Sequence, residues 1–108
     1  MGNRLYKTSP NSVCNNPLEY EELNEYQKAT LQDWIAECVI PHKAKTFNPF
    51  HTSYGLKHQF EYNSGIYITN GQFKGAMLTA GFEPRSYNDL NWVFKIGKRT
   101  GTRISVVK

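Results

Sequence analysis

The sequence has little cysteine, no long apolar stretch and no common metal-binding spacing. Only two of its 108 residues are cysteine, Cys14 and Cys38, which is too few for a disulfide framework. Cys38 falls on the apolar stripe of a predicted helix and Cys14 lies in a polar arm, so we expect reduced thiols. No apolar run approaches the roughly 18 residues of a membrane span, and the N-terminus lacks the pattern of a signal peptide. These absences favour a cytoplasmic protein.

Catalytic and metal motifs are also missing. The three histidines, His42, His51 and His58, fit no standard zinc spacing. Two carboxylates, Glu83 and Asp89, share one polar loop, but no nucleophile and base accompany them. The segment 97–101, Gly-Lys-Arg-Thr-Gly, is predicted to join two strands, whereas a phosphate loop opens a helix. We therefore expect no enzyme activity, no metal and no cofactor.

Charge is divided unevenly along a chain that has the length of a single domain. We expect a flexible arm at 1–16 and one domain at 17–108. Residues 1–52 contain five Lys or Arg and six Asp or Glu, whereas residues 53–108 contain eight and three, a net charge of +5. Phosphate is a natural partner for the basic half, because each Lys or Arg that neutralises a phosphate releases condensed counterions.

The first half predicts a long helix and an extended connector. Asn16, Pro17 and Glu19 resemble a capping box, and an apolar stripe continues from there to Pro41. The connector at 41–52 contains two prolines, which exclude a continuous helix. Its lysines, Lys43 and Lys45, are candidate phosphate contacts. Its phenylalanines either stack on bases or attach the connector to the core.

The second half adds two helices and three short strands. Thr69 or Asn70 is expected to cap the second of these helices, and Gly81 to close it. Residues 91–96 alternate with period two, and a turn at 97–101 would return the chain as a hairpin. We predict an α+β fold, a winged helix-turn-helix with an extra N-terminal helix and a C-terminal β-hairpin wing, whose elements in this half are helix 54–62, strand 66–68, helix 72–80, strand 91–96 and strand 103–107.

This order predicts nucleic-acid contacts on the later helix and on the hairpin. The helix is expected to expose Gln72, Lys74 and Thr79, a face without arginine that suits backbone or shape recognition better than base reading. The hairpin would supply the main phosphate contacts, which are Lys95, Lys98, Arg99 and Arg103. Tyr67 and Tyr87 are the aromatic rings expected to be free for stacking on bases.

A family resemblance rests on three stretches. These are Ser-Tyr-Gly-Leu-Lys-His-Gln-Phe-Glu at 53–61, Gly-Ile-Tyr-Ile-Thr-Asn-Gly-Gln-Phe-Lys-Gly-Ala-Met at 65–77 and Asn-Trp-Val-Phe at 91–94. Together they resemble small winged-helix proteins of phages and mobile cassette elements of Gram-positive bacteria, some of which bind single-stranded DNA beside a replicative helicase. The resemblance implies an accessory role in the replication or transfer of a mobile element, with DNA and a replication protein as partners.

Several alternatives stay open at this stage. The DNA is single-stranded or duplex, with the single strand favoured, and the protein is a monomer or a homodimer. One alternative function is a protein-binding module, such as an inhibitor of a defence nuclease or a partner of a polymerase or helicase. Another is a dimeric transcriptional regulator whose first helix forms the interface.

Overall fold

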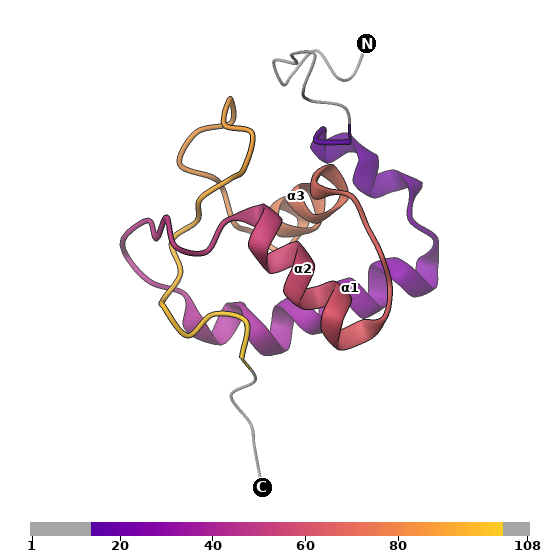
Figure 1. The fold of residues 1–108 in the computed structure, drawn as a ribbon, viewed down its shortest axis with the longest axis horizontal. Helices are drawn as coiled ribbons and strands as arrows, with labels where there is room; N and C mark the ends of the chain where they lie inside the picture. The colour runs from indigo at the N-terminus through magenta and orange to yellow at the C-terminus, as the bar shows by residue number, and fades with distance from the viewer. Residues whose placement is uncertain (1–13, 103–108) are drawn as a thin grey trace, which may run out of the picture.

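Helices form all the regular structure in the part of the chain that is described. The computed structural model describes residues 14–102. Its elements are, in order, the 3-10 helix η3 (Pro17–Glu22), α1 (Glu25–Cys38), the 3-10 helix η4 (Ile40–His42), α2 (Ser53–Ser64) and α3 (Asn70–Thr79). In Figure 1, α2 crosses in front of α1, and η3 packs beside α3.

The long first helix expected from the sequence is divided in two near Leu23. Asn16 caps the first part as expected, because its side chain accepts a hydrogen bond from the Leu18 N–H at 2.9 Å, but residues 17–22 form a 3-10 helix. A second capping box then starts α1. The Asn24 side chain accepts from the Gln27 N–H at 2.8 Å, and the Gln27 side chain accepts from the Asn24 N–H at 2.9 Å. This pair satisfies two backbone donors and favours a new helix over a continued one.

The ends of α3 follow the predicted signals, and α2 begins and ends at residues of the same kinds. Thr52 caps α2, and Gly65 ends it in the left-handed conformation with φ of 78°. Thr69 caps α3 with a reciprocal bond to Gln72. Gly81, with φ of 97°, follows the last turn, where the Phe82 N–H donates to the Met77 carbonyl and the Gly81 N–H to that of Leu78. That pair of bonds is the Schellman arrangement, which glycine at this position permits.

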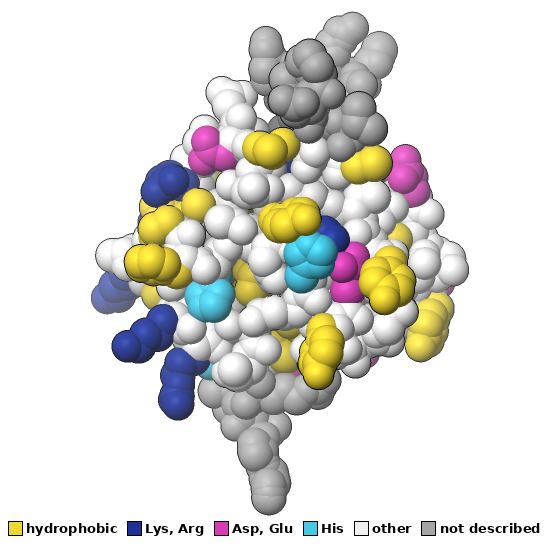
Figure 2. Space-filling model, viewed as in Figure 1, with side chains coloured by type: hydrophobic (Ala, Val, Ile, Leu, Met, Phe, Trp, Pro, Cys, Tyr) yellow, Lys and Arg dark blue, Asp and Glu magenta, His cyan; other side chains and the backbone are white. Residues whose placement is uncertain are grey.

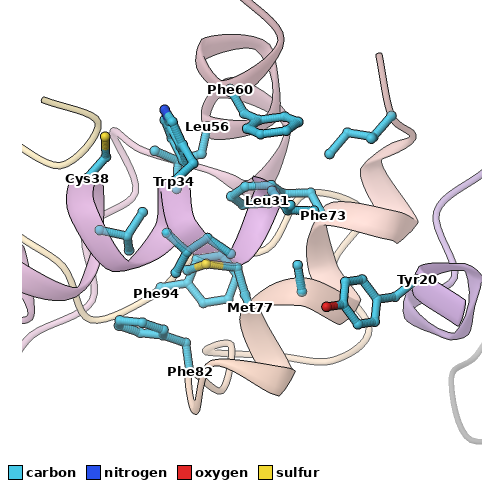
Figure 3. Packing of buried hydrophobic residues seen from close by; sticks show 14 of the residues in the cluster. Tyr20, Leu31, Trp34, Cys38, Leu56, Phe60, Phe73, Met77, Phe82 and Phe94 are labelled. Atoms are coloured by element: carbon cyan, nitrogen blue, oxygen red, sulfur yellow. The ribbon is translucent and has the colours of Figure 1, made fainter. Parts of the chain in front are cut away.

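One hydrophobic core joins the three α-helices. Trp34 of α1 meets Phe60 of α2 and Phe73 of α3 edge to face, with ring centroids 5.9 and 6.2 Å apart. Figure 3 shows these rings with Met77 and Phe94 beneath them. The indole N–H of Trp34 donates to the Asn63 side chain at 2.8 Å, so its polar atom is satisfied as well. Burial of each of these large side chains contributes about 1.5 to 3 kcal/mol.

The predicted β-hairpin wing is wrong for residues 14–102, which contain no strand or sheet. Residues 91–96 form only isolated bridges, Lys43 with Ile96 and Thr52 with Val93, and the chain bends at Asn91 and Lys95. Their partner is therefore the connector. The return strand expected at 103–107 lies outside the described residues. The predicted α+β winged helix is therefore wrong, and the described residues have a mostly helical fold.

Irregular spacing explains why this pairing does not become a ladder. The Ala44 N–H donates to the Lys95 carbonyl at 3.0 Å, and the Asn48 N–H donates to the neighbouring Phe94 carbonyl, also at 3.0 Å. The two donors are thus four residues apart in the connector, whereas their acceptors are consecutive residues. In an antiparallel ladder both strands would advance by the same number of residues. Trp92, Phe94 and Ile96 are buried as the alternating pattern indicates, but Val93 is buried too, at 4% exposed, so the pattern reflects burial rather than membership of a sheet.

The short strand expected at 66–68 is also absent. The Ile66 N–H donates to the Ser64 hydroxyl, and the Ile68 N–H donates to the buried Glu61 carboxylate, each at 3.0 Å. Side chains therefore satisfy backbone groups that a strand would have paired. The β-branched residues at 66 and 68 are partly or fully buried, which accounts for the apolar pattern without a sheet.

The helix expected to read DNA is covered by η3. A Cβ atom at Gly71 would collide with the Asn16 backbone, and one at Gly75 would collide with the Pro17 carbonyl and the Tyr20 side chain. The two glycines lie one turn apart and let η3 approach the helix backbone. Their role is internal packing, and η3 leaves no room for nucleic acid to approach the helix backbone at these two positions.

Gly75→Ala should lower the free energy of unfolding by about 1 to 3 kcal/mol, because its new methyl group forces η3 away from α3. The matched control is Gly55→Ala in α2, where the nearest atom to a new Cβ is Thr52 Oγ1 at 3.8 Å. That variant should gain about 0.5 to 1 kcal/mol from helix propensity. Urea denaturation of both variants measures the difference, and equal effects would contradict the packing argument.

Candidate nucleic-acid interface

Two segments that are far apart in sequence form one surface. The connector lies against residues 92–97, and besides the bonds of Ala44 and Asn48, the Gly97 N–H donates to the His42 carbonyl at 2.7 Å. Lys43 and Lys45 are thereby brought beside Lys95, Lys98 and Arg99. We call these five cations the basic surface. In Figure 2, Lys and Arg side chains gather along the left margin, where the connector lies in Figure 1.

No carboxylate interrupts the two segments that carry the basic surface. Residues 39–52 and 90–102 contain no Asp or Glu. All five side chains are exposed, and none makes an ion pair with a described residue. Aromatic rings support two of them, since the Lys43 ammonium lies 5.5 Å from the ring centroid of Phe82 and that of Lys95 lies 5.2 Å from Phe47. The surface therefore presents positive charge that no ion pair compensates, and aromatic rings support part of it.

The turn that carries Lys98 and Arg99 is held at several points. The Gly101 N–H donates to the Cys38 carbonyl at 2.8 Å, so this turn completes the C-terminal end of α1. A ring nitrogen of His51 lies 2.8 Å from the Lys98 carbonyl oxygen. Thr100 is buried and bonds the Gly97 carbonyl. Residues 97–101 form a turn, but the predicted hairpin is wrong, because residues 91–96 are not a strand and the turn instead closes the end of α1.

Two of the three residues predicted on the later helix do not form an open contact face. Lys74 is only 3% exposed, so its expected exposure is wrong. Its ammonium donates to the carbonyls of Asn15 at 3.1 Å and Asp89 at 3.4 Å, and it lies 5.0 Å from the ring centroid of Trp92. Gln72 is half-buried and occupied by the capping box. Thr79 is exposed at the C-terminal end of α3, away from Gln72 in the first turn.

The predicted aromatic and wing residues have different outcomes. Tyr67 is 80% exposed. Tyr87 is 40% exposed and packs edge to face on Trp92, with centroids 5.3 Å apart. Arg103 lies outside the described residues.

Two further exposed side chains lie near this surface: Phe50, one of the two connector phenylalanines considered above, and Arg85, which sequence reasoning did not single out. Phe50, on the connector, is 90% exposed, so it is not one of the rings that attach the connector to the core. Arg85 is exposed, and its backbone N–H donates to the Val93 carbonyl at 2.9 Å, which places another cation beside the basic surface. The absence of acidic residues around 39–52 is a sequence signal for this region. The contact between the two segments has no such signal.

Other kinds of site find little support among residues 14–102. They contain no group of three His, Cys, Asp or Glu side chains able to hold a metal ion. Within the same residues, no helix combines the length and apolar character needed to cross a membrane. Comparison with known proteins gives no match, either to a family model, to a curated protein or to a solved structure. The family resemblance therefore stays a prediction.

Lys74 should make stability depend on pH in the alkaline range. Burial lowers the pKa of its ammonium from 10.5 to about 8, and the charges of Asp89 and Glu19 offset only part of this effect. At a pH between these two pKa values the unfolded chain binds more protons than the folded chain, so the free energy of unfolding rises with pH. Lys74→Met lacks this titration.

Urea titrations of the native chain and Lys74→Met from pH 7 to pH 10.5 isolate the effect, because shared titrations cancel in the difference. The native chain should gain stability relative to the variant above pH 8. A difference that stays constant with pH would show that the ammonium is not desolvated in the folded state.

Proposed function

We propose that this protein binds nucleic acid through the basic surface. The observation that carries the proposal is the meeting of two acid-free segments, which places Lys43 and Lys45 beside Lys95, Lys98 and Arg99. Each cation that contacts a phosphate releases counterions, so affinity increases with the number of contacts and falls with salt. Five exposed cations without acidic partners are suited to this mode of binding.

Recognition of the phosphate backbone fits the fold better than reading of base edges in a duplex. The helix that would enter a major groove is covered by η3, and its lysine is buried. The basic surface instead consists of loop backbone with lysine and arginine side chains, which are suited to phosphates and carry little sequence information. DNA is the proposed partner. A role in the replication or transfer of a mobile element rests on the family resemblance alone.

The alternative functions have less support from the packing. In a dimeric regulator with its interface on the first helix, an apolar stripe would be free, but Leu31, Trp34 and Ile35 of α1 are buried in the core of the same chain. A protein-binding module stays a prediction, whether as an inhibitor of a defence nuclease or as a partner of a replication protein.

The double variant Lys98→Ala/Arg99→Ala should weaken DNA binding about tenfold or more at low salt, because two phosphate contacts are lost. For a single strand the slope of log K against log salt should become less steep by about 1.4, at about 0.7 for each contact. Fluorescence anisotropy with labelled single strands, duplexes and RNA at several salt concentrations measures both quantities.

Two controls separate charge from structure. Lys98→Arg/Arg99→Lys keeps both positive charges and should keep most of the affinity and the slope. Lys28→Ala removes a cation of α1 that pairs with Glu21 and is not part of the basic surface, and it should leave binding nearly unchanged. Absence of binding to every oligonucleotide at low salt would overturn the proposed function, as would binding that does not respond to salt.

A further inference from the structure

A pocket of about 450 Å³ opens beside the segments that carry the basic surface. Tyr54 and Lys57 of α2 form one wall, and Leu90 and Asn91 form another, while Ile68 and Asn70 line the pocket between them. The last wall residue, Asn91, precedes Lys95 by four residues. Four residues span at most about 14 Å, so the pocket lies within a few nucleotides of the basic surface.

Hydrogen bonds hold the two walls together without a ligand. The Trp92 N–H donates to the Ser53 hydroxyl at 2.9 Å, and the Ser53 N–H donates back to the Trp92 carbonyl at 2.9 Å. The Asn70 amide donates to the Leu90 carbonyl at 3.1 Å and to the Asn91 side chain at 3.0 Å. The pocket is therefore preformed, which lowers the entropic cost of filling it.

The lining combines apolar surface with hydrogen-bond donors and has no carboxylate. Tyr54, Ile68 and Leu90 provide a ring and aliphatic walls. The Lys57 ammonium lies 5.3 Å from the Tyr54 ring centroid and donates one hydrogen bond, to Glu61 at 3.0 Å, so two of its N–H donors are not used by that bond. The Asn91 Nδ2 group makes no hydrogen bond with a described residue, which adds another donor.

Glu61 holds the side chain of Lys57 in place through their ion pair. Burial alone would raise the pKa of the Glu61 carboxyl, but hydrogen bonds from the Ile68 N–H and the Lys57 ammonium outweigh it and hold the pKa below 4.5. The carboxylate therefore stays ionised at neutral pH behind the ammonium. The site presents donors to a ligand and keeps its acidic group occupied.

We propose that this pocket binds one unpaired nucleobase of a single-stranded nucleic acid whose phosphates lie on the basic surface. A base is flat and neutral, so it can stack on Tyr54 between aliphatic side chains, and its ring carbonyls or nitrogens can accept from Lys57 and Asn91. A bare phosphate would leave the apolar walls unmatched, and a hydrocarbon would leave the donors unsatisfied. The inference rests on the proposed function and adds selectivity for unpaired strands.

The test compares a thymidine oligonucleotide with an abasic oligonucleotide of the same length and charge. The native chain should bind the thymidine strand about tenfold more tightly, since loss of one stacked base removes that order of affinity. Leu90→Trp should abolish most of this preference, because Leu90 is half exposed at the wall and a larger ring there fills the pocket. The matched control is Leu18→Trp on η3, a similarly exposed leucine outside the pocket lining, which should keep the preference.

Tyr54 supplies a second, chemically specific variant pair. Tyr54→Leu should bind the thymidine strand nearly as weakly as the abasic strand, and Tyr54→Phe should retain the preference because the ring is kept. Thermal unfolding of every variant confirms that it is folded. If Leu90→Trp fails to fold, the two Tyr54 variants decide the matter.

The outcomes separate this inference from the proposed function. Equal affinity of the native chain for both strands, with salt-dependent binding lost in Lys98→Ala/Arg99→Ala, would overturn the base pocket and leave the basic surface in place. A preference for thymidine that Leu90→Trp and Tyr54→Leu leave unchanged would also overturn it. No binding of either strand at low salt would overturn the base pocket, because the base is delivered by a bound strand. It would overturn the proposed function as well only if duplexes and RNA also failed to bind.

Discussion

The segment at 92–97 joins the core to the surface, and the other features of the described chain depend on it. Its side chains Trp92, Phe94 and Ile96 are almost completely buried among the three α-helices. Its carbonyl groups accept from the start of α2, from the connector and from the loop at 85. Because a buried backbone group must find a partner, the segment orders the chain on both of its sides. The connector is held in place by these bonds although it has almost no regular structure.

A second constraint comes from the missing side chains at Gly71 and Gly75. They allow η3 to contact the backbone of α3, and this contact covers the helix that a helix-turn-helix protein would insert into DNA. Lys74 is buried under the same packing and binds backbone carbonyls of the preceding and following segments. The helix is thus a structural element at the centre of the fold, and any contact with nucleic acid has to be made elsewhere.

The two proposals assign different chemistry to neighbouring surfaces. The basic surface offers charge on a support of aromatic rings, which suits a flexible polyanion of any sequence. The pocket offers a tyrosine, aliphatic walls and hydrogen-bond donors, which suit a single base that is free of its partner. The bonds between Ser53 and Trp92 join the two regions, so a strand bound on one would have its bases close to the other.

Local signals in the sequence determined the helix ends and the charge pattern, whereas long-range contacts decided the architecture. Thr52, Thr69, Gly65 and Gly81 mark their helices because capping and left-handed backbone depend on neighbouring residues alone. The alternation at 91–96 correctly indicated burial, but it was interpreted as a wing, because period-two burial does not reveal which segment pairs with the backbone. The same limit applies to the candidate site. Its lysines were identified from charge, but their meeting across about fifty residues, the burial of Lys74 and the pocket beside Tyr54 depend on packing that only the tertiary structure decides.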